Sequence, residues 1–191
     1  MPCATVRSVL NAFKRMAEPT GDDVSELTYA EIGATRHEPL PSGYRHLHYR
    51  TYLGRDVFEQ AGDAVLTFRM HRATGARVTA DADRAAPGVR VRVGAGLGPP
   101  ALSVPCEVVW AADDDRRAGF GYGTLPGHQA RGEESFVVER DEHGRVWFTV
   151  TAFSVPARLP MRLGGPVARL AQHGYARICG RALKRLCPAP R

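Results

Sequence analysis

The sequence predicts an α+β fold, in which one antiparallel sheet packs against helices, and three observations support this. The hydrophobic pattern has a period of about 3.6 residues before residue 78, about 2 from there to residue 153, and about 3.6 again after residue 156. Turn-forming residues separate the stretches of period 2, as they do in antiparallel hairpins. Gathering the helices on one face of such a sheet buries the apolar sides of both.

Length and composition are typical of a soluble globular protein. The chain has 191 residues, of which 43% are hydrophobic and 24% charged, and this length suits one sizeable core. No apolar run reaches the roughly 18 residues of a membrane helix, and the first residues lack the apolar segment of a secretory signal. We expect a cytoplasmic protein without a transmembrane segment. Its single domain is expected over residues 27–187, after an N-terminal helical extension (1–26) and before a short tail (188–191).

The first elements are a helix and a strand. Residues 6–17 carry an apolar stripe at helical spacing, which predicts a short amphipathic helix. Residues 27–35 are predicted to form a strand that ends at a turn at Gly33. The following residues, 36–43, include two prolines and are expected to be a loop.

A second helix is expected to start near Asp56. Asp56 and Glu59 have the three-residue spacing of a capping box, and apolar residues follow at helical spacing until Gly75. In residues 89–93, valines alternate with arginines, which predicts a strand with its valines inward and its arginines outward.

Four more strands and a long helix complete the predicted fold. The strands are expected over residues 103–111, 118–125, 133–140 and 145–153. After Pro156 the helical period returns, with Pro166 near the start of the helix. The helix is expected to pack one stripe of side chains on the sheet, namely Val167, Leu170, Tyr175 and Ile178.

Cysteine and histidine spacing gives no sign of a metal site. The four cysteines, Cys3, Cys106, Cys179 and Cys187, include no pair at the spacing of a zinc knuckle or a redox dithiol, so free thiols are expected. His46 and His48 would share a strand face, but no third ligand lies at metal spacing. We therefore expect neither a metal nor a cofactor.

The net charge of +6 is concentrated at the C-terminal end. No acidic residue follows residue 157, whereas eight basic residues do: Arg158, Arg162, Arg169, Arg177, Arg181, Lys184, Arg185 and Arg191. A solvated helix face explains such a pattern, and so does a surface for an anionic partner.

Residues 119–136, GFGYGTLPGHQARGEESF, form the least common stretch of the chain. In a strand its aromatic residues and its glycines face opposite sides, Phe120 and Tyr122 on one, and Gly119, Gly121 and Gly123 on the other. A bare glycine strip permits close approach by a helix, a strand or a ligand, and a bend in a curved sheet is the alternative. We expect the strip to border a ligand cavity, because the aromatic residues already supply packing on the other face.

The same stretch holds the candidate catalytic residues His128, Glu133 and Glu134. Adjacent carboxylates on a strand point to opposite faces, so at most one of the two glutamates can face a cavity. His128 lies in a turn and is either a solvent-exposed side chain or a general base that titrates near neutrality. The glycine-rich residues 94–98 run into two prolines instead of a helix, which argues against a dinucleotide site.

These residues carry a resemblance to a family. The chain resembles the uncharacterised bacterial and plant protein family zero-five-four-eight over about residues 27–186. The segments that carry the resemblance are residues 120–136, Tyr29 to Thr35, Leu53-Gly54 before Phe58, Ala152-Phe153-Ser154 with Pro156, and Gly165-Pro166 with Arg169 and Gln172. Where the family usually keeps a second glycine after Leu-Gly, this chain has Arg55-Asp56, so that turn is expected to differ. The family has no established activity, so the resemblance implies site positions without a reaction.

The order of elements also resembles the START-like, or helix-grip, superfamily. That resemblance implies a curved antiparallel sheet that grips a long C-terminal helix, with space for an apolar ligand between them, although one fold hosts many functions. The residues expected to line this space are Tyr29, Phe120, Gly121, Tyr122, Gly123, Phe136 and Phe153. For the aromatic residues, ordinary core packing is the alternative.

Three functions are therefore considered. The first is binding of a small apolar or lipid-like ligand in a cavity between the sheet and the C-terminal helix. The second is an enzyme of the same fold that uses His128 or a cavity-facing glutamate as acid or base. The third is an interaction module whose basic C-terminal helix binds nucleic acid, anionic membrane or an acidic partner, for which we expect only weak, non-specific nucleic-acid binding. The sequence leaves the ligand, any reaction and the oligomeric state open.

Overall fold

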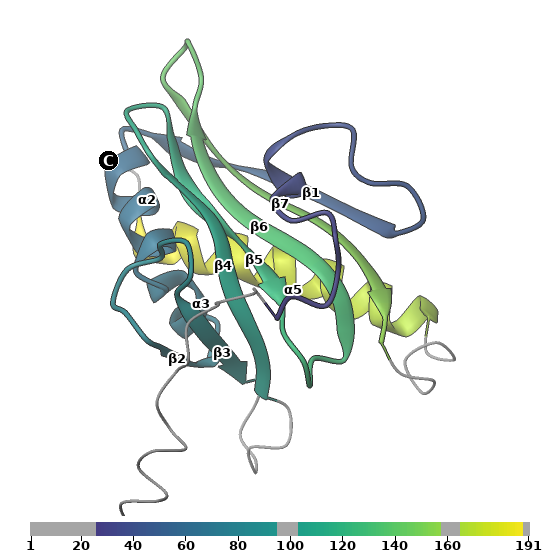
Figure 1. Ribbon diagram of the computed structural model, residues 1–191. Helices are drawn as coiled ribbons and strands as arrows, with labels where there is room; N and C mark the ends of the chain where they lie inside the picture. The colour runs from purple at the N-terminus through teal and green to yellow at the C-terminus, as the bar shows by residue number, and fades with distance from the viewer. Residues whose placement is uncertain (1–25, 95–102, 158–164, 189–191) are drawn as a thin grey trace, which may run out of the picture.

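Seven strands form one antiparallel sheet in the computed structural model, which describes residues 26–94, 103–157 and 165–188 (Figure 1). The strands are β1 (Arg45–Arg55), β2 (Arg77–Ala80), β3 (Arg90–Gly94), β4 (Ser103–Asp113), β5 (Arg117–Thr124), β6 (Ala130–Arg140) and β7 (Arg145–Pro156), in the spatial order β1-β7-β6-β5-β4-β3-β2. The helices are the 3-10 turn η1 (Ala34–Arg36) and the α-helices α2 (Phe58–Leu66), α3 (Arg69–Ala73) and α5 (Gly165–Leu186). The predicted α+β class, a curved antiparallel sheet with a long C-terminal helix, is confirmed.

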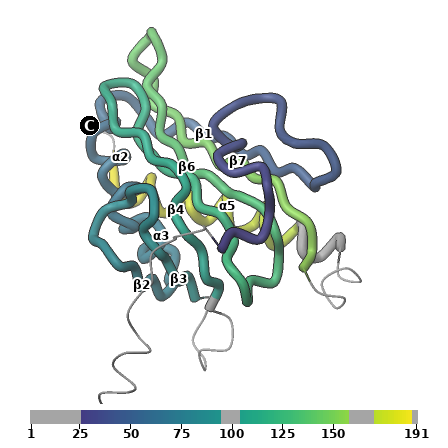
Figure 2. Tube along the Cα trace, viewed as in Figure 1, coloured from purple at the N-terminus to yellow at the C-terminus, as the bar shows by residue number. Residues whose placement is uncertain are grey.

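The α-helices cover one face of the sheet, which we call the inner face. α2 packs against β5 and β6, while α5 packs against β1 and α3. In Figure 1, α5 crosses behind the sheet and residues 26–44 lie in front of it, and the chain trace in Figure 2 shows the same order. Residues 26–44 therefore lie on the opposite side, the outer face.

The core fills the space between the inner face and the helices. On β7 every second side chain is buried there, and α5 adds the buried Cys179 and Leu183. His71 of α3 is also fully buried, with its ring centroid 4.6 Å from that of Phe136, and neither ring nitrogen has a hydrogen-bond partner among the residues that the structure describes. Burial lowers the pKa of His71 to about 3, so the imidazole is neutral and packs as an aromatic ring.

The predicted strands from residue 89 onward are present, but the prediction for the first strand was wrong. Residues 27–35 form bends and the turn η1, whereas the strand that sequence analysis did not assign is β1. Residues 27–35 lie on the outer face and form no strand of the sheet, because β5 already has β4 and β6 as neighbours. The expected helix at 6–17 lies outside the described residues.

The predicted second helix is present, but its capping box is not. Val57 is the N-cap residue and makes no side-chain hydrogen bond, while Asp56 has a φ of 57° in the turn that leaves β1. The expected run to Gly75 is also interrupted, because Phe68 has a φ of 59° and ends α2 before α3 begins. This left-handed residue directs a fully buried ring into the core.

The C-terminal helix packs on the sheet as predicted, and Tyr175 of the expected stripe packs against the core, but Leu170 and Ile178 do not. Leu170 and Ile178 are 72% and 43% exposed, whereas Ala176, Cys179 and Leu183 are buried. A Cβ at Gly180 would lie 2.9 Å from the Tyr49 hydroxyl of β1, so small residues face the sheet where the helix comes closest to it. The side chain of Val167 lies outside the described residues.

The glycine strip faces the outer side, so the expectation that it borders a cavity was wrong. A register shift between Val108 and Trp110 turns the Trp110 side chain to the outer face, opposite Gly121. A Cβ on Gly121 would overlap the indole of Trp110 and lie 3.0 Å from the Thr35 hydroxyl oxygen. A Cβ on Gly123 would overlap the Tyr29 side chain. The strip therefore makes room for an indole and for the N-terminal segment.

Gly121→Val is expected to destabilise the protein by about 1 to 3 kcal/mol, because the added methyl groups overpack against Trp110 and Thr35. Urea denaturation measures the change in the free energy of unfolding. Gly174→Val is the matched control, since a Cβ at Gly174 meets nothing within 4 Å. Equal stability of the two variants would contradict this packing role.

Candidate functional site

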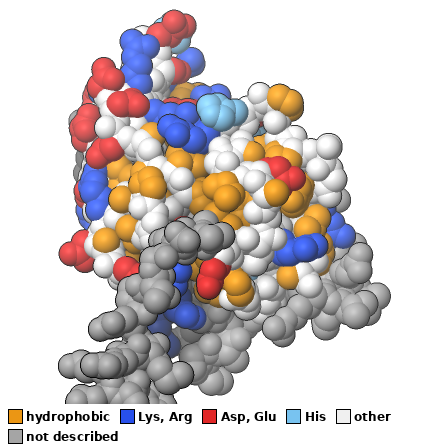
Figure 3. Space-filling view, viewed as in Figure 1, with side chains coloured by type: hydrophobic (Ala, Val, Ile, Leu, Met, Phe, Trp, Pro, Cys, Tyr) orange, Lys and Arg blue, Asp and Glu red, His pale blue; other side chains and the backbone are white. Residues whose placement is uncertain are grey.

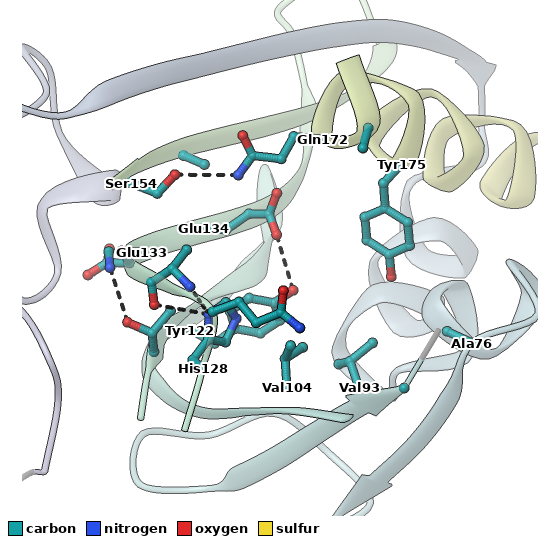
Figure 4. A pocket seen from close by; sticks show the side chains of 17 residues that line it. Ala76, Val93, Val104, Tyr122, His128, Glu133, Glu134, Ser154, Gln172 and Tyr175 are labelled. Atoms are coloured by element: carbon teal, nitrogen blue, oxygen red, sulfur yellow. Dashed lines mark hydrogen bonds between the residues drawn. The ribbon is translucent and has the colours of Figure 1, made fainter. Parts of the chain in front are cut away.

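A cavity of about 400 Å³ lies between the inner face of the sheet and α5 (Figure 4). Its lining includes the small or apolar residues Ala76, Val93, Val104, Ala130, Ala152 and Ala171, and the polar side chains of Tyr122, His128, Glu134, Ser154, Gln172 and Tyr175. Strands from β3 to β7 and the helix α5 all contribute to it. A mostly apolar pocket with a few convergent polar groups is the usual form of a small-molecule site.

Glu134 is the acidic group of this cavity. Its Oε2 accepts a hydrogen bond from the Tyr122 hydroxyl at 3.1 Å, and Figure 4 shows the two side chains pointing toward each other from neighbouring strands. Burial raises the pKa of Glu134 to about 7, although the Tyr122 hydrogen bond acts in the opposite direction. Both the acid and the carboxylate are therefore populated near neutral pH, which suits proton transfer or recognition of a donor.

α5 adds two polar tips to the opposite wall. Gln172 Nε2 donates to the Ser154 Oγ of β7 at 3.4 Å. The Tyr175 ring reaches into the cavity (Figure 4), and its buried hydroxyl makes no well-formed hydrogen bond within the described part of the chain. Burial raises the pKa of Tyr175, so this hydroxyl stays protonated and is free to donate to or accept from a ligand.

His128 borders the cavity from the loop between β5 and β6. Its Nδ1 accepts a hydrogen bond from the Ala130 N–H at 2.9 Å, which fixes the ring to its own turn. Burial lowers the pKa of His128, so the imidazole is neutral at physiological pH. Only Nε2 is free for a ligand, and of the candidate acids and bases Glu134 has the more direct access to the cavity.

The carboxylate of Glu133 lies on the outer face, as strand alternation requires. Oε2 accepts hydrogen bonds from the Tyr29 hydroxyl and the Gly33 N–H, both at 2.7 Å. Oε1 accepts from the N–H of Thr35 at 2.9 Å, from the Thr35 hydroxyl, and from the indole N–H of Trp110 at 3.3 Å. With this many donors the carboxylate is fully engaged, so Glu133 anchors residues 29–35 to the sheet and is not free to act on a ligand.

Of the seven expected ligand-binding residues, only Tyr122 lines the cavity. Tyr29 and Phe153 pack edge to face on the outer side, with ring centroids 5.6 Å apart. Phe120 and Phe136 are fully buried around His71 in the core. These four residues, together with Gly121 and Gly123, do not line this cavity, because strand alternation and the hydrophobic core place them elsewhere.

Sequence reasoning missed most of the cavity wall. Ser154 and Gln172 belong to the segments that carried the family resemblance, so that resemblance could have identified them as site residues. Tyr175 was placed on the apolar stripe of the helix without its polar role. Val93 and Val104 look like ordinary strand residues, and only the packing of the sheet against α5 places them at a cavity.

No group of three or more histidine, cysteine or acidic side chains suited to a metal ion occurs among the described residues. His46 and His48 share the outer face of β1, and His46 Nε2 lies 2.8 Å from the Pro41 carbonyl oxygen. Cys106, Cys179 and Cys187 are free and buried, and burial raises the pKa of Cys179 to about 12, which disfavours a reactive thiolate. Cys3 lies outside the described residues.

A second concavity, of about 370 Å³, lies on the outer face near η1. Figure 3 shows arginine and histidine side chains gathered on that face, and the lining includes Arg36, His48, Arg50 and Arg117. Glu139 also lines it and lies 3.6 Å from Arg117 as an ion pair. Since acidic and basic groups offset one another there, the apolar cavity on the inner face is the stronger candidate site.

Fold and cavity together define an α+β protein in which a curved antiparallel sheet packs against a long C-terminal helix, with a cavity between them. Residues 28–182 match the family described as "Domain of unknown function (DUF1990)". Because this match covers most of the chain, the chain belongs to that family.

Curated relatives support the same membership. The UPF0548 protein of Deinococcus radiodurans is 49% identical over 79 residues, and that of Arabidopsis thaliana is 38% identical over 91 residues. These alignments cover 41% and 44% of this chain, and 40% and 44% of the relatives' own length. The predicted resemblance to this uncharacterised family is confirmed.

Solved structures share the fold at low sequence identity. The hypothetical protein jhp0584 of Helicobacter pylori aligns with a TM-score of 0.61 at 10% identity, over 90% of this chain and 99% of that one. Protein MLL2253 of Mesorhizobium loti aligns with a TM-score of 0.50 at 14% identity, over 74% and 98% of the two chains. These similarities concern the fold alone, and the START-like resemblance stays a prediction from the order of elements.

The helices of the described segments include none that is both long and apolar enough to cross a membrane.

Glu133→Gln is expected to destabilise the protein by about 1 to 3 kcal/mol, because an amide nitrogen replaces one acceptor among buried donors. Urea denaturation measures the loss, and faster hydrogen exchange at the Gly33 and Thr35 amides locates it. Glu139→Gln, on the same face of β6, removes only a partly exposed ion pair and should cost less than about 1 kcal/mol. A similar loss in the free energy of unfolding in both variants would show that Glu133 does not anchor residues 29–35.

Glu134 should make stability fall as pH rises from about 4.5 to about 7. In that window the folded chain retains a proton that the unfolded chain has lost, so the free energy of unfolding decreases and then levels off. The decline is on the order of 1 to 3 kcal/mol, since a tenfold difference in acidity corresponds to about 1.4 kcal/mol. Urea denaturation across this range should show a smaller decline for Glu134→Gln, which cannot ionise. An unchanged decline in that variant would refute the assignment.

Proposed function

We propose that this protein binds a small, largely apolar ligand in the cavity between its sheet and α5. The observation that carries the proposal is the cavity itself, whose aliphatic lining residues are alanines and valines and into which the acidic side chain of Glu134 points. Its volume of about 400 Å³ lies within the usual range of small-molecule sites, about 300 to 1,000 Å³. Apolar contacts would provide affinity, and the polar tips would fix the orientation of the ligand.

The arrangement of the polar groups supports this proposal. Glu134 and Tyr122 lie on the sheet side, whereas Gln172 and Tyr175 come from α5, so a ligand between them can be hydrogen-bonded from both walls. The Tyr175 hydroxyl is buried without a well-formed hydrogen bond in the described chain, and a buried polar atom in that state has a free-energy cost. A ligand group that bonds this hydroxyl would remove the cost.

An acid–base enzyme of the same fold is the second candidate, and one observation favours it. The pKa of Glu134, about 7, is where a general acid or base works best at neutral pH. In that reading Glu134 exchanges a proton with the ligand while the Tyr122 hydroxyl stabilises the carboxylate. His128 is the weaker candidate, because its Nδ1 is engaged by the Ala130 backbone.

The remaining expectations stay predictions. The exposed Arg177, Arg181 and Lys184 of α5 form a solvated basic face, for which we expect weak and salt-sensitive nucleic-acid binding only. A cytoplasmic location and a single domain over residues 27–187, with an extension at 1–26 and a tail at 188–191, are likewise proposed from the sequence.

Native mass spectrometry of freshly purified protein tests the ligand proposal directly. We expect a co-purified small molecule whose mass is lost on denaturation and whose extract partitions into organic solvent. A chain that is free of bound molecules, and that takes up no apolar compound from an added mixture, would contradict the proposal.

Val104→Phe should abolish ligand retention, because the larger ring fills part of the cavity. The matched control is Val109→Phe on the same strand, since Val109 does not line the cavity. We expect the Val109 variant to retain ligand as the wild type does, and both variants to stay folded in circular dichroism. Equal retention by the two variants would place the ligand elsewhere.

A further inference from the structure

The carboxyl group of Glu134 has far more hydrogen-bonding capacity than the protein uses. Within the described residues it accepts one hydrogen bond, from the Tyr122 hydroxyl at 3.1 Å, whereas an ionised carboxylate has about four acceptor positions. Figure 4 shows the group directed into the cavity between β6 and α5. Glu133, one residue earlier, shows how this chain saturates a buried carboxylate that serves structure alone. The free acceptor positions of Glu134 therefore point to a ligand.

Among the described residues, the groups around Glu134 supply no positive charge. Those that interact with it electrostatically or share its cavity are Tyr122 of β5, Cys106 of β4, Tyr175 and Cys179 of α5, and His128 of the β5–β6 loop. Burial raises the pKa of the tyrosines and cysteines and lowers that of His128, so all five are neutral near pH 7. The described residues that line the cavity include no lysine or arginine.

We infer that the ligand of this cavity carries a positively charged nitrogen that binds the Glu134 carboxylate, while its apolar body lies against the alanine and valine wall. This inference rests on the proposed function and names the chemical class of the ligand. An ammonium group supplies the missing counter-ion and fills the free acceptor positions of Glu134. The Tyr175 hydroxyl, which makes no well-formed hydrogen bond in the described chain, provides a second acceptor from the α5 side.

The same electrostatics disfavour a ligand of the opposite charge. A fatty carboxylate would bring a second negative charge beside Glu134 in an apolar site, and one of the two carboxyl groups would have to remain protonated. A neutral alcohol gains one hydrogen bond but no ion pair. We therefore expect the affinity of ligands with the same apolar body to decrease in the order amine, alcohol, carboxylate.

Binding of the cation should also release a proton. Free Glu134 is about half protonated near pH 7, and a nearby ammonium favours its ionised form. Affinity for an amine should then increase from about pH 6 to about pH 8 and level off above that, until the amine itself loses its proton at about pH 10. An alcohol should show no such dependence.

Isothermal titration calorimetry with decylamine, decanol and decanoate, each below its micellar concentration, tests the inference on the full chain. At about pH 8 we expect decylamine to bind at least about tenfold more tightly than decanol, and decanoate to bind most weakly. Glu134→Gln should lose about tenfold in affinity for decylamine and keep its affinity for decanol. Glu139→Gln, on the outer face of the same strand, should behave as the wild type.

The outcomes separate this inference from the proposed function. Decanol binding without a preference for the amine would overturn the inference and leave the apolar site in place. A preference for the amine that persists in Glu134→Gln, or tighter binding of decanoate, would also overturn it. If none of the three compounds binds, the proposed function fails, and the inference fails with it. Titrations in two buffers of different ionisation enthalpy give the proton release as an independent measurement.

Discussion

The alternation of side chains along β6 is the constraint on which the rest of the structure depends. Glu133 and Glu134 are adjacent, so a strand held between two neighbours must send one carboxyl group to each face of the sheet. On the outer face, the Glu133 carboxylate accepts hydrogen bonds from a tyrosine, two backbone amides, a threonine hydroxyl and an indole, and it thereby holds residues 29–35 in place. On the inner face, Glu134 meets one tyrosine and an apolar cavity. A shift of one residue in register would exchange these two environments.

The glycines of β5 support the same arrangement on the outer face. Gly121 and Gly123 leave the outer face bare where the Trp110 indole and Tyr29 approach the backbone, and both of those side chains bond to Glu133. The bulge at β4 brings Trp110 to that face. The glycine-rich stretch 119–136 thus supports the anchor of the N-terminal segment on the outer face, and on the inner face it contributes Tyr122, Thr124 and Glu134 to the cavity.

Glu134 is the residue that stability alone does not explain. A buried carboxyl group with a single hydrogen bond makes the folded state less favourable above the pH at which the unfolded chain ionises, and a nonpolar side chain would avoid this effect. Such local conflicts are concentrated at functional sites, where the ligand or the reaction compensates for them. In this family of unknown function, Glu134 is therefore the first residue to test by biochemical experiments.

The sequence by itself determined the α+β class, the hairpin strands from residue 89 onward, the C-terminal helix and the opposite orientation of the two glutamates, because hydrophobic period and strand alternation are local properties. It failed for residues 27–35, which the Glu133 carboxylate holds against the outer face of the sheet and which form no strand. It also failed for Leu170 and Ile178, because the side of α5 that meets the sheet depends on how closely Gly180 and Ala176 allow β1 to approach. Only the tertiary structure decided which glutamate faces the cavity, and which residues enclose the cavity together with Tyr175 and Gln172. The reason is that residues far apart in sequence meet there when α5 packs across the inner face.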